Sequence, residues 1–342
     1  MTHPAAVNER YMRRALELAA HGRGFVSPNP MVGAVIVGPG DRIIGEGYHR
    51  RYGGPHAEVN AVNSVSAADR PLLGRSTIYV TLEPCSHFGK TPPCALLLKE
   101  IGIGRVVVGS PDPNPLVAGR GVAMLRQAGI KVVEGMLRQE CMALNEVFMS
   151  AQIRRRPFVT LKWAQSADGY MDCQRAPGES AARFSTPVTS AIVHWRRSCA
   201  DAIAVGAGTV LSDNPRLDVR LIHGRSPRPV VFDRHCLLSG SDYVLSDESR
   251  STVHLCGDEN LEEQLKRLFA EHSISSLLVE GGARLLESFI SQGLWDRAFV
   301  EEAPFRLGSK GRVRAPLINA LPCSTLVVDG RTIYSFKSPG QA

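Results

Sequence analysis

The apolar and polar positions of the first fifty residues predict one helix and one hairpin. Residues 8–21 carry an apolar stripe at helical spacing, and Gly22 follows at a place where helices commonly end. Residues 31–37 and 42–48 are strand-like apolar runs on either side of a short segment of glycine, proline and aspartate. Two such runs around a short turn predict a pair of strands joined as a hairpin.

Beyond the hairpin, helical and strand-like patterns alternate along the whole chain. In the first half we expect helices that begin near His56 and Cys94 or cover residues 121–128 and 137–149, and strands at residues 77–82, 105–109 and 131–134. In the second half we expect strands at residues 158–163, 201–205, 229–232, 252–255 and 275–279, and helices at residues 187–199 and 282–290. Such alternation predicts a sheet, parallel in its later part, with helices on both faces.

The first half ends in an expected helix that leads into the cluster Arg154, Arg155 and Arg156 and then Pro157. We therefore place a domain boundary near residue 150. A chain of 342 residues is long enough for two domains. The expected organisation is an α/β domain at residues 1–150 and a second α/β domain at residues 151–342.

Composition and charge exclude several classes of protein. Apolar residues make up 44% of the chain and charged residues 21%, as in ordinary globular domains, which rules out fibrous and disordered architectures. No apolar run approaches the roughly 18 residues needed to cross a bilayer, and the first residues do not form a secretory signal. The net charge of +7 is spread over both halves, whereas a nucleic-acid binder would concentrate it on one element. We expect a cytoplasmic homo-oligomer without nucleic-acid or membrane partners.

A candidate metal site is formed by His56, Cys85 and Cys94. Eight cysteines are too few for a disulfide framework in so long a chain, so metal binding or catalysis is their expected use. His56 and Cys94 lie where helices are expected to begin, and Cys85 follows a strand, so all three can meet at one edge of the sheet. One histidine and two cysteines leave the fourth position of zinc to water, whereas His87 as a fourth ligand would make the site structural.

Glu58, two residues after His56, favours catalysis at this site. Zinc lowers the pKa of bound water toward neutrality and so makes a hydroxide nucleophile available. In zinc deaminases this hydroxide attacks the ring carbon that bears the amine, and a glutamate that is not a ligand moves the protons. The pattern therefore predicts one zinc ion and a hydrolytic deamination.

Residues 1–150 resemble the cytidine and deoxycytidylate deaminase superfamily, and more narrowly the deaminase half of the bifunctional riboflavin-biosynthesis enzymes. The superfamily usually has two residues between its cysteines, but eight separate Cys85 from Cys94, as in the riboflavin enzymes. Other matching segments are Asn29-Pro-Met-Val-Gly, Gly47-Tyr-His, Pro111-Asp-Pro-Asn-Pro and Val117-Ala-Gly-Arg-Gly. The resemblance implies a cytidine-deaminase-like three-layer α/β/α domain with zinc ligands His56, Cys85 and Cys94, the catalytic Glu58, and the substrate residues Asn29, His49, Lys90, Asp112 and Asn114.

In the second half, a glycine pair is the candidate ligand-binding feature. Gly281 and Gly282 lie between an expected strand and an expected helix, where backbone amides can approach a phosphate group. The spacing is not that of a Rossmann fingerprint, so glycines that merely form tight turns remain an alternative.

This segment nevertheless resembles the reductase half of the same enzymes, which has a dihydrofolate-reductase-like α/β fold and uses NADPH. The positions that match cofactor contacts are Ala164, Thr209, Asp213, Gly282, Ala283, Arg284, Leu285, Leu286, Glu287 and Ser288. Those that match substrate contacts are Ser180, Arg197, Leu217, Arg220 and Glu280. Arg197 and Arg220 have the fork-shaped guanidinium group that suits a sugar phosphate.

Two positions depart from the family pattern. Many members have Trp-Ile-Thr shortly after Gly-Glu-Ser, but the residues after Ser180 read Ala-Ala-Arg183-Phe-Ser-Thr, so an aromatic cofactor contact is missing or shifted. Arg234 stands where a serine often contacts the cofactor, and we expect it to pair with the 2′-phosphate of NADP.

The resemblance implies two consecutive reactions on one small phosphorylated pyrimidine. The first domain would deaminate 2,5-diamino-6-ribosylamino-4(3H)-pyrimidinone 5′-phosphate with a zinc hydroxide. The second would use NADPH to reduce the ribosyl group of 5-amino-6-(5-phosphoribosylamino)uracil to ribityl. One alternative is a zinc deaminase for a nucleoside, nucleotide or tRNA base, which the long inter-cysteine loop and the second domain oppose. The other is a zinc-stabilised binding protein, which would not need Glu58.

Overall fold

The computed structural model describes residues 8–88, 92–114, 118–174, 182–238 and 243–339. The chain divides into two compact units, Met1–Arg154 and Arg155–Ala342. In these described ranges, no helix combines the length and the apolar character that a membrane span requires.

The first unit is built on a five-stranded sheet in the order β2-β1-β3-β4-β5. Its strands are β1 (Gly33–Val37), β2 (Ile43–Tyr48), β3 (Thr77–Leu82), β4 (Arg105–Ser110) and β5 (Lys131–Glu134). β1 is antiparallel to β2 and β3, whereas β3, β4 and β5 are parallel. The predicted hairpin and the parallel later part of the sheet are both confirmed.

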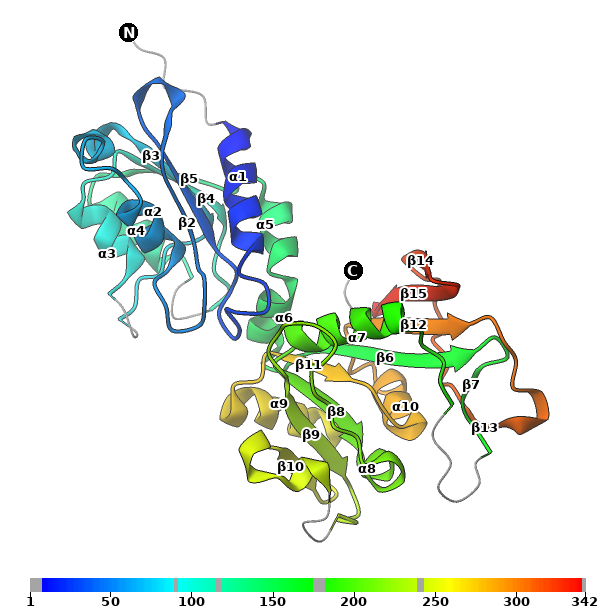
Figure 1. Ribbon diagram of the computed structural model, residues 1–342. Helices are drawn as coiled ribbons and strands as arrows, with labels where there is room; N and C mark the ends of the chain where they lie inside the picture. Colours follow the sequence, from blue (N-terminus) through cyan, green and yellow to red (C-terminus); the bar gives the residue numbers. More distant parts are fainter. Residues whose placement is uncertain (1–7, 89–91, 115–117, 175–181, 239–242, 340–342) are drawn as a thin grey trace. The chain divides into compact units, whose positions relative to one another are not determined.

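Helices cover both faces of this sheet (Figure 1). One face is covered by α1 (Glu9–Ala20) and α5 (Arg138–Leu144), and the other by α2 (Ala57–Asn63), α3 (Cys94–Glu100) and α4 (Arg120–Gln127). Helix α1 lies close to β1 at Gly33, where an added Cβ would be 1.9 Å from the carbonyl oxygen of Ala15. This is the expected three-layer α/β/α arrangement.

The prediction of a single helix at residues 137–149 is wrong, because the helix is interrupted at Asn145 and forms two helices, α5 and α6 (Glu146–Arg154). Asn145 is buried, and its side chain accepts a hydrogen bond from Met31 N and donates one to Met31 O, both at 2.8 Å. The side chain thereby pairs with the backbone just before β1, and its own backbone leaves the helical region (φ −107°, ψ 24°). Helix α6 then continues to Arg154, four residues past the boundary that we placed near residue 150.

The second unit contains an eight-stranded sheet in the order β10-β9-β8-β11-β6-β12-β15-β14. Its first six strands in this order are parallel, and the last two pairings are antiparallel. Its strands are β6 (Phe158–Ser166), β8 (Ala202–Gly206), β9 (Arg228–Asp233), β10 (Val253–Cys256), β11 (Ser276–Val279), β12 (Arg297–Ala303), β14 (Ser324–Val328) and β15 (Arg331–Lys337). A separate antiparallel pair is formed by β7 (Tyr170–Cys173) and β13 (Gly311–Arg314).

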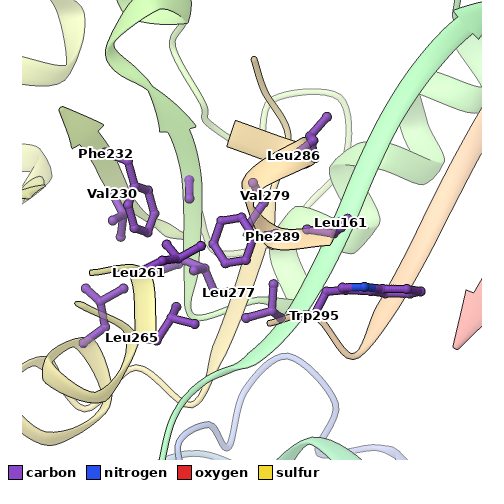
Figure 2. Packing of buried hydrophobic residues seen from close by; sticks show 14 of the residues in the cluster. Leu161, Val230, Phe232, Leu261, Leu265, Leu277, Val279, Leu286, Phe289 and Trp295 are labelled. Atoms are coloured by element: carbon purple, nitrogen blue, oxygen red, sulfur yellow. The ribbon is translucent and has the colours of Figure 1, made fainter. Parts of the chain in front are cut away.

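The main core of the second unit lies between this sheet and two helices, α9 (Leu261–His272) and α10 (Ala283–Ser291). Figure 2 shows Phe289 and Leu286 of α10 and Leu261 and Leu265 of α9 among the apolar side chains of the strands. The opposite face is covered by α7 (Pro187–Cys199) and α8 (Ala207–Asp213). Strands β8 and β11 are buried along almost their whole length, as expected for parallel strands covered on both faces.

Candidate active sites

The three predicted metal ligands meet at the edge of the first sheet where β3 ends. His56 is the N-cap residue of α2, Cys94 is the first residue of α3, and Cys85 lies three residues after β3. The Nδ1 atom of His56 is 3.5 Å from Sγ of Cys85 and 3.4 Å from Sγ of Cys94. All three donor atoms lie within 4.8 Å of one another.

This geometry fits a zinc ion. Zinc–nitrogen bonds of about 2.0 Å and zinc–sulfur bonds of about 2.3 Å at a tetrahedral angle place nitrogen and sulfur about 3.5 Å apart. The two His56–cysteine separations agree with this value. Among the described residues, the cluster of donor atoms consists of His56, Cys85 and Cys94 and does not include His87.

Cys85 is prepared to bind as a thiolate. A hydrogen bond from Cys94, followed by one from His56, lowers the pKa of the Cys85 thiol to about 4. The pKa of Cys94 is raised in turn, because its thiol proton is held by the Cys85 sulfur. The backbone N–H of Cys94 at the start of α3 also donates to Cys85 Sγ at 3.3 Å. Metal binding would release the proton that the two sulfurs share.

Glu58 lies in the first turn of α2 and is buried, with 3% of its surface exposed. Burial raises its pKa to about 7, and the neighbouring Cys85 thiolate adds to the increase. A carboxyl group with a pKa near neutrality can both accept and donate a proton at physiological pH. Its position beside the ligands is therefore suited to the proton transfers of a hydrolysis.

Asn29 and His49 adjoin the ligand cluster. The His49 ring lies 5.4 Å from the His56 ring, in an edge-to-face arrangement. Nδ1 of His49 is 3.0 Å from Pro55 O, and Nε2 is 3.2 Å from Nδ2 of Asn29. Since a carbonyl only accepts, Nδ1 carries the proton and Nε2 accepts from the Asn29 amide. Burial lowers the pKa of His49, so the neutral form of the ring that these contacts require is favoured.

Asp112 and Asn114 lie in the loop after β4. Asp112 is mostly buried, and its Oδ1 accepts a hydrogen bond of 2.8 Å from the backbone of Asn114. Burial raises the pKa of Asp112 to about 6, and the carboxylate of Glu83 adds to the increase. Lys90, the remaining substrate residue predicted for this unit, lies outside the described residues.

Glu83 belongs to the site and was missed in the sequence. Its buried carboxylate accepts hydrogen bonds from the backbone N–H groups of Gly119 (3.0 Å), Gly121 (3.1 Å) and Val122 (3.3 Å). It thereby joins the loop around Asp112 and the start of α4 to the end of β3. Its only local signal is its place directly before Pro84 and Cys85, because a glutamate after a strand is usually exposed.

In the second unit, Arg197 and Glu280 form a buried pair. Nε and Nη2 of Arg197 lie 3.0 and 2.6 Å from the two carboxylate oxygens of Glu280, and Nη1 donates to Asp218 O at 3.0 Å. Burial acts to raise the pKa of Glu280, but the hydrogen bonds from Arg197 outweigh it and hold the pKa below its usual value. Two of the predicted substrate residues thus lie together and form an ion pair with each other.

The predicted substrate residues Leu217 and Arg220 lie on the loop after α8. Leu217 is buried, and the backbone N–H of Arg220 donates to Nδ1 of His194 on α7 at 3.0 Å. The Arg220 guanidinium pairs with Asp218 and remains half exposed. It is therefore accessible to a ligand in a way that the Arg197 guanidinium is not. Ser180 lies outside the described residues.

The predicted cofactor residues surround the junction of β8, β11 and α10. Gly282 has a φ of 70°, and an added Cβ at Gly281 would lie 3.2 Å from Val205 and 3.3 Å from Thr209. Two glycines thus keep a narrow backbone cradle open at the N-terminus of α10, where the first N–H groups of a helix have no intrahelical partner. Asp213 ends α8, and Ala164 lies on β6.

Not every residue in the predicted run along α10 offers its side chain to a ligand. Leu286 is fully buried in the core, and Leu285 packs against that core. Any cofactor contact of Leu286 would therefore involve backbone atoms.

The end of β9 holds Arg234 and an unexpected disulfide. Arg234 is exposed and pairs with Asp258, which follows β10. Cys236 and Cys256 form a disulfide with a Cα–Cα distance of 5.1 Å. The expectation that metal binding or catalysis accounts for the cysteines is therefore wrong for this pair, which only the parallel pairing of β9 with β10 brings together.

Comparison with known proteins assigns the chain to a family. A family model described as the cytidine and deoxycytidylate deaminase zinc-binding region matches residues 6–110, and one described as the RibD C-terminal domain matches residues 157–321. The riboflavin biosynthesis protein RibD of Actinobacillus pleuropneumoniae is 42% identical over 327 residues, which cover 88% of this chain and 84% of that protein. The chain belongs to the RibD family.

Solved structures of RibD proteins agree with this assignment over nearly the whole chain. Acinetobacter baumannii RibD is 33% identical with a TM-score of 0.86, covering 96% of this chain and 98% of that one. A Thermotoga maritima structure described as a diaminohydroxyphosphoribosylaminopyrimidine deaminase and 5-amino-6-(5-phosphoribosylamino)uracil reductase is 37% identical, with a TM-score of 0.83 and the same coverage. The family resemblance and the fold class expected from the sequence are confirmed.

The segment that departs from the RibD pattern packs within its own unit. Phe184 is buried, and its ring stacks on Phe305 with 5.7 Å between the ring centroids. The next residue, Ser185, donates its hydroxyl hydrogen bond to Glu301 at 2.7 Å. Phe184, the aromatic residue closest in sequence to the position where many family members have tryptophan, is therefore buried in the protein interior.

Sequence reasoning also missed Lys162 of β6 and Glu301 of β12. Both side chains are buried in the polar cluster that contains Arg197 and Glu280. In the sequence each occurs within a mixed polar and apolar run that is typical of a half-exposed strand. Only their burial in the folded unit distinguishes them from the exposed polar residues of an ordinary edge or surface strand.

Proposed function

We propose that this RibD-family enzyme deaminates its pyrimidine substrate in the first unit and reduces the product in the second. Zinc in the first unit and NADPH in the second are the cofactors. The substrate of the first reaction is 2,5-diamino-6-ribosylamino-4(3H)-pyrimidinone 5′-phosphate. The substrate of the second is 5-amino-6-(5-phosphoribosylamino)uracil, whose ribosyl group becomes ribityl.

In the deamination, the protein residues hold the metal and move protons. Zinc held by His56, Cys85 and Cys94 would supply a water of near-neutral pKa as nucleophile. Glu58 would accept a proton as the water oxygen bonds to the ring carbon and would donate a proton to the amine as the carbon–nitrogen bond breaks. The second water proton ends on the adjacent ring nitrogen, whose double bond to the carbon is lost as the carbonyl forms. Ammonia leaves, and a carbonyl replaces the amine. The burial of Glu58 and its pKa of about 7 support both transfers.

Four residues of the first unit would bind the substrate. We assign this role to Asn29, His49, Asp112 and Asn114. The hydrogen bonds of His49 to Pro55 and Asn29 fix the orientation of its ring and of the Asn29 amide. Fixed polar groups of this kind bind a ring without an additional ordering cost.

In the reduction, the second unit positions the sugar and the cofactor. NADPH supplies the hydride that reaches the sugar C1′. The cradle at Gly281 and Gly282 and the N-terminus of α10 suit its pyrophosphate. Arg220 is the accessible cation for the sugar phosphate, while Arg197 holds Glu280 at the carboxyl end of β11.

The observation that carries the deaminase proposal is the buried Glu58 beside three donor atoms. Ammonia release and NADPH oxidation are measured separately on the full chain with the pyrimidine phosphate. Glu58→Gln should retain zinc, abolish ammonia release, and still oxidise NADPH when the deaminated product is supplied. Glu100→Gln, an exposed change at the end of α3, should alter neither reaction. Ammonia release by the Glu58→Gln protein would contradict the proposal.

We also propose that the enzyme acts as a homo-oligomer in the cytoplasm. β14 is an edge strand of the eight-stranded sheet and exposes Leu326 and Val327. Exposed apolar edge strands favour pairing with another chain. Light scattering should give a mass above that of one chain, and Val327→Lys should lower it. Cell fractionation tests the location.

A further inference from the structure

A polar cluster lies buried between the sheet of the second unit and α7. Lys162 of β6 and Glu301 of β12 have 14% and 3% of their side chains exposed. The two strands are parallel neighbours in which Lys162 is opposite Phe299 and Glu301 is opposite Ala164. Since alternate residues of a strand share a face, Lys162 and Glu301 are diagonal neighbours on the face toward α7.

The Glu301 carboxylate is held by two hydroxyl groups. Oε1 accepts a hydrogen bond of 2.6 Å from Thr189 of α7, and Oε2 accepts one of 2.7 Å from Ser185. Both oxygens act as acceptors, which suits a carboxylate. Ser185 belongs to the segment that departs from the family pattern, so this contact gives that segment a role in the cluster.

Glu301 is the carboxylate available to Lys162. Its Oε2 lies 4.0 Å from Nζ of Lys162, whereas both oxygens of the nearby Glu280 are engaged by Arg197. At 4.0 Å the charges attract, but the contact is too long for a hydrogen bond. The ammonium lies in the same buried cluster as Glu280 and Arg197, two of the residues predicted to bind the substrate.

This attraction favours the charged form of Lys162. Burial lowers its pKa, and the carboxylates of Glu280 and Glu301 act in the opposite direction. Arg197 and Arg196 of α7 lower the pKa further. Glu280 has the larger effect of the two carboxylates, but it is paired with Arg197, which acts against it. Glu301 adds a second negative charge, whose oxygens accept hydrogen bonds from hydroxyl groups.

We propose that Glu301 is a positioning residue of the reductase, held by Ser185 and Thr189, which keeps the Lys162 ammonium protonated and directed toward the substrate. The inference rests on the proposed reductase function. Lys162 is the group that would contact the pyrimidine, and Glu301 acts only through it. Ser185, which lies just before α7, is hydrogen-bonded to the same carboxylate.

The experiment compares Glu301→Gln with wild type in the NADPH-oxidation assay, using the full chain and the deaminated pyrimidine phosphate. The matched control is Glu302→Gln, which removes the same charge from the opposite face of β12. We expect kcat/KM for the pyrimidine to fall about tenfold in Glu301→Gln, with KM for NADPH changed less than about twofold. The control should match wild type.

The pH profile separates positioning from a merely structural role. Glu301 raises the pKa of Lys162, so its removal lowers that pKa and the ammonium is lost at lower pH. The basic limb of kcat/KM should move down by about one pH unit in Glu301→Gln. Glu301→Asp, which keeps the charge, should leave the limb in place. An unmoved limb in Glu301→Gln would overturn the proposal, even if its Tm were lower.

Two further comparisons keep the result interpretable. Ser185→Ala removes one hydroxyl near the surface and should produce a smaller shift of the same sign, so it serves if Glu301→Gln does not fold. If Glu301→Gln does not fold and the basic limb of kcat/KM does not move in Ser185→Ala, the proposal is contradicted. Absence of NADPH oxidation by wild type would instead contradict the reductase function itself. Ammonia release in the same samples reports whether the first unit is intact.

Discussion

Replacing Glu83 should destabilise the first unit and weaken its substrate site together. Glu83→Ala removes the acceptor for four backbone N–H groups. Those of Gly121 and Val122 are buried, that of Gly119 is on an exposed residue, and that of Asp112 is at the limiting distance of 3.5 Å. Each buried N–H left without a partner costs about 1–3 kcal/mol, while the exposed one can bind water. The two buried groups therefore predict a loss of about 2–6 kcal/mol. Glu83→Gln keeps one acceptor oxygen and should lose less.

The assay is urea unfolding of the full chain, followed by zinc release for the first unit and by NADPH oxidation for the second. Glu83→Ala should lower the urea midpoint of zinc release and leave the reductase midpoint in place. Because Glu83 joins the Asp112 loop to β3, KM for the deaminase substrate should also rise. Glu100→Ala, on the surface of α3, is the control. An unchanged midpoint and KM in Glu83→Ala would refute the reasoning.

Four further outcomes are expected. Removal of zinc by a chelator should abolish ammonia release and leave NADPH oxidation of supplied product unchanged; loss of both would contradict separate sites. Gly121→Ala places a Cβ 1.9 Å from Pro84 O and should lower zinc content, measured on purified protein, because the loop before Cys85 must move. Asp296→Ala leaves the buried Arg156 without its two hydrogen bonds of 2.8 and 3.1 Å and should destabilise the second unit by about 3–5 kcal/mol in urea unfolding. Arg234→Ala should reduce the kinetic preference for NADPH over NADH about tenfold, and an unchanged preference would exclude a 2′-phosphate contact.

Local signals in the sequence were sufficient for most elements of the parallel sheets. Strands β3 and β5 and helix α7 have the predicted bounds, because their apolar periods end at clear turn or capping residues. The C-terminal strands β12, β14 and β15 were not predicted. β14 contains the apolar residues Leu326, Val327 and Val328 in succession, without polar alternation, and exposes most of its residues. It is defined by its hydrogen-bonded pairing with β15.

The zinc site was predictable because its ligands lie at element boundaries that the sequence itself marks. His56 and Cys94 begin helices and Cys85 follows a strand, so convergence at one sheet edge follows from the α/β pattern. The break at Asn145 was not predictable, because it depends on hydrogen bonds to Met31, 114 residues away in the chain. The same reason explains why the disulfide between Cys236 and Cys256 was missed.

The sequence by itself determined the two α/β segments and the family, and it predicted the cluster of His56, Cys85 and Cys94, because each depends on local periodicity or on residue types at short spacing. Only the tertiary structure decided which buried charges belong together. Glu83 is defined by N–H groups of a loop more than thirty residues later, and Glu301 by hydroxyls more than one hundred residues earlier. A buried charge needs partners that replace water, and those partners come from whichever elements fold against it. Their identity is therefore settled only when the sheets and helices pack.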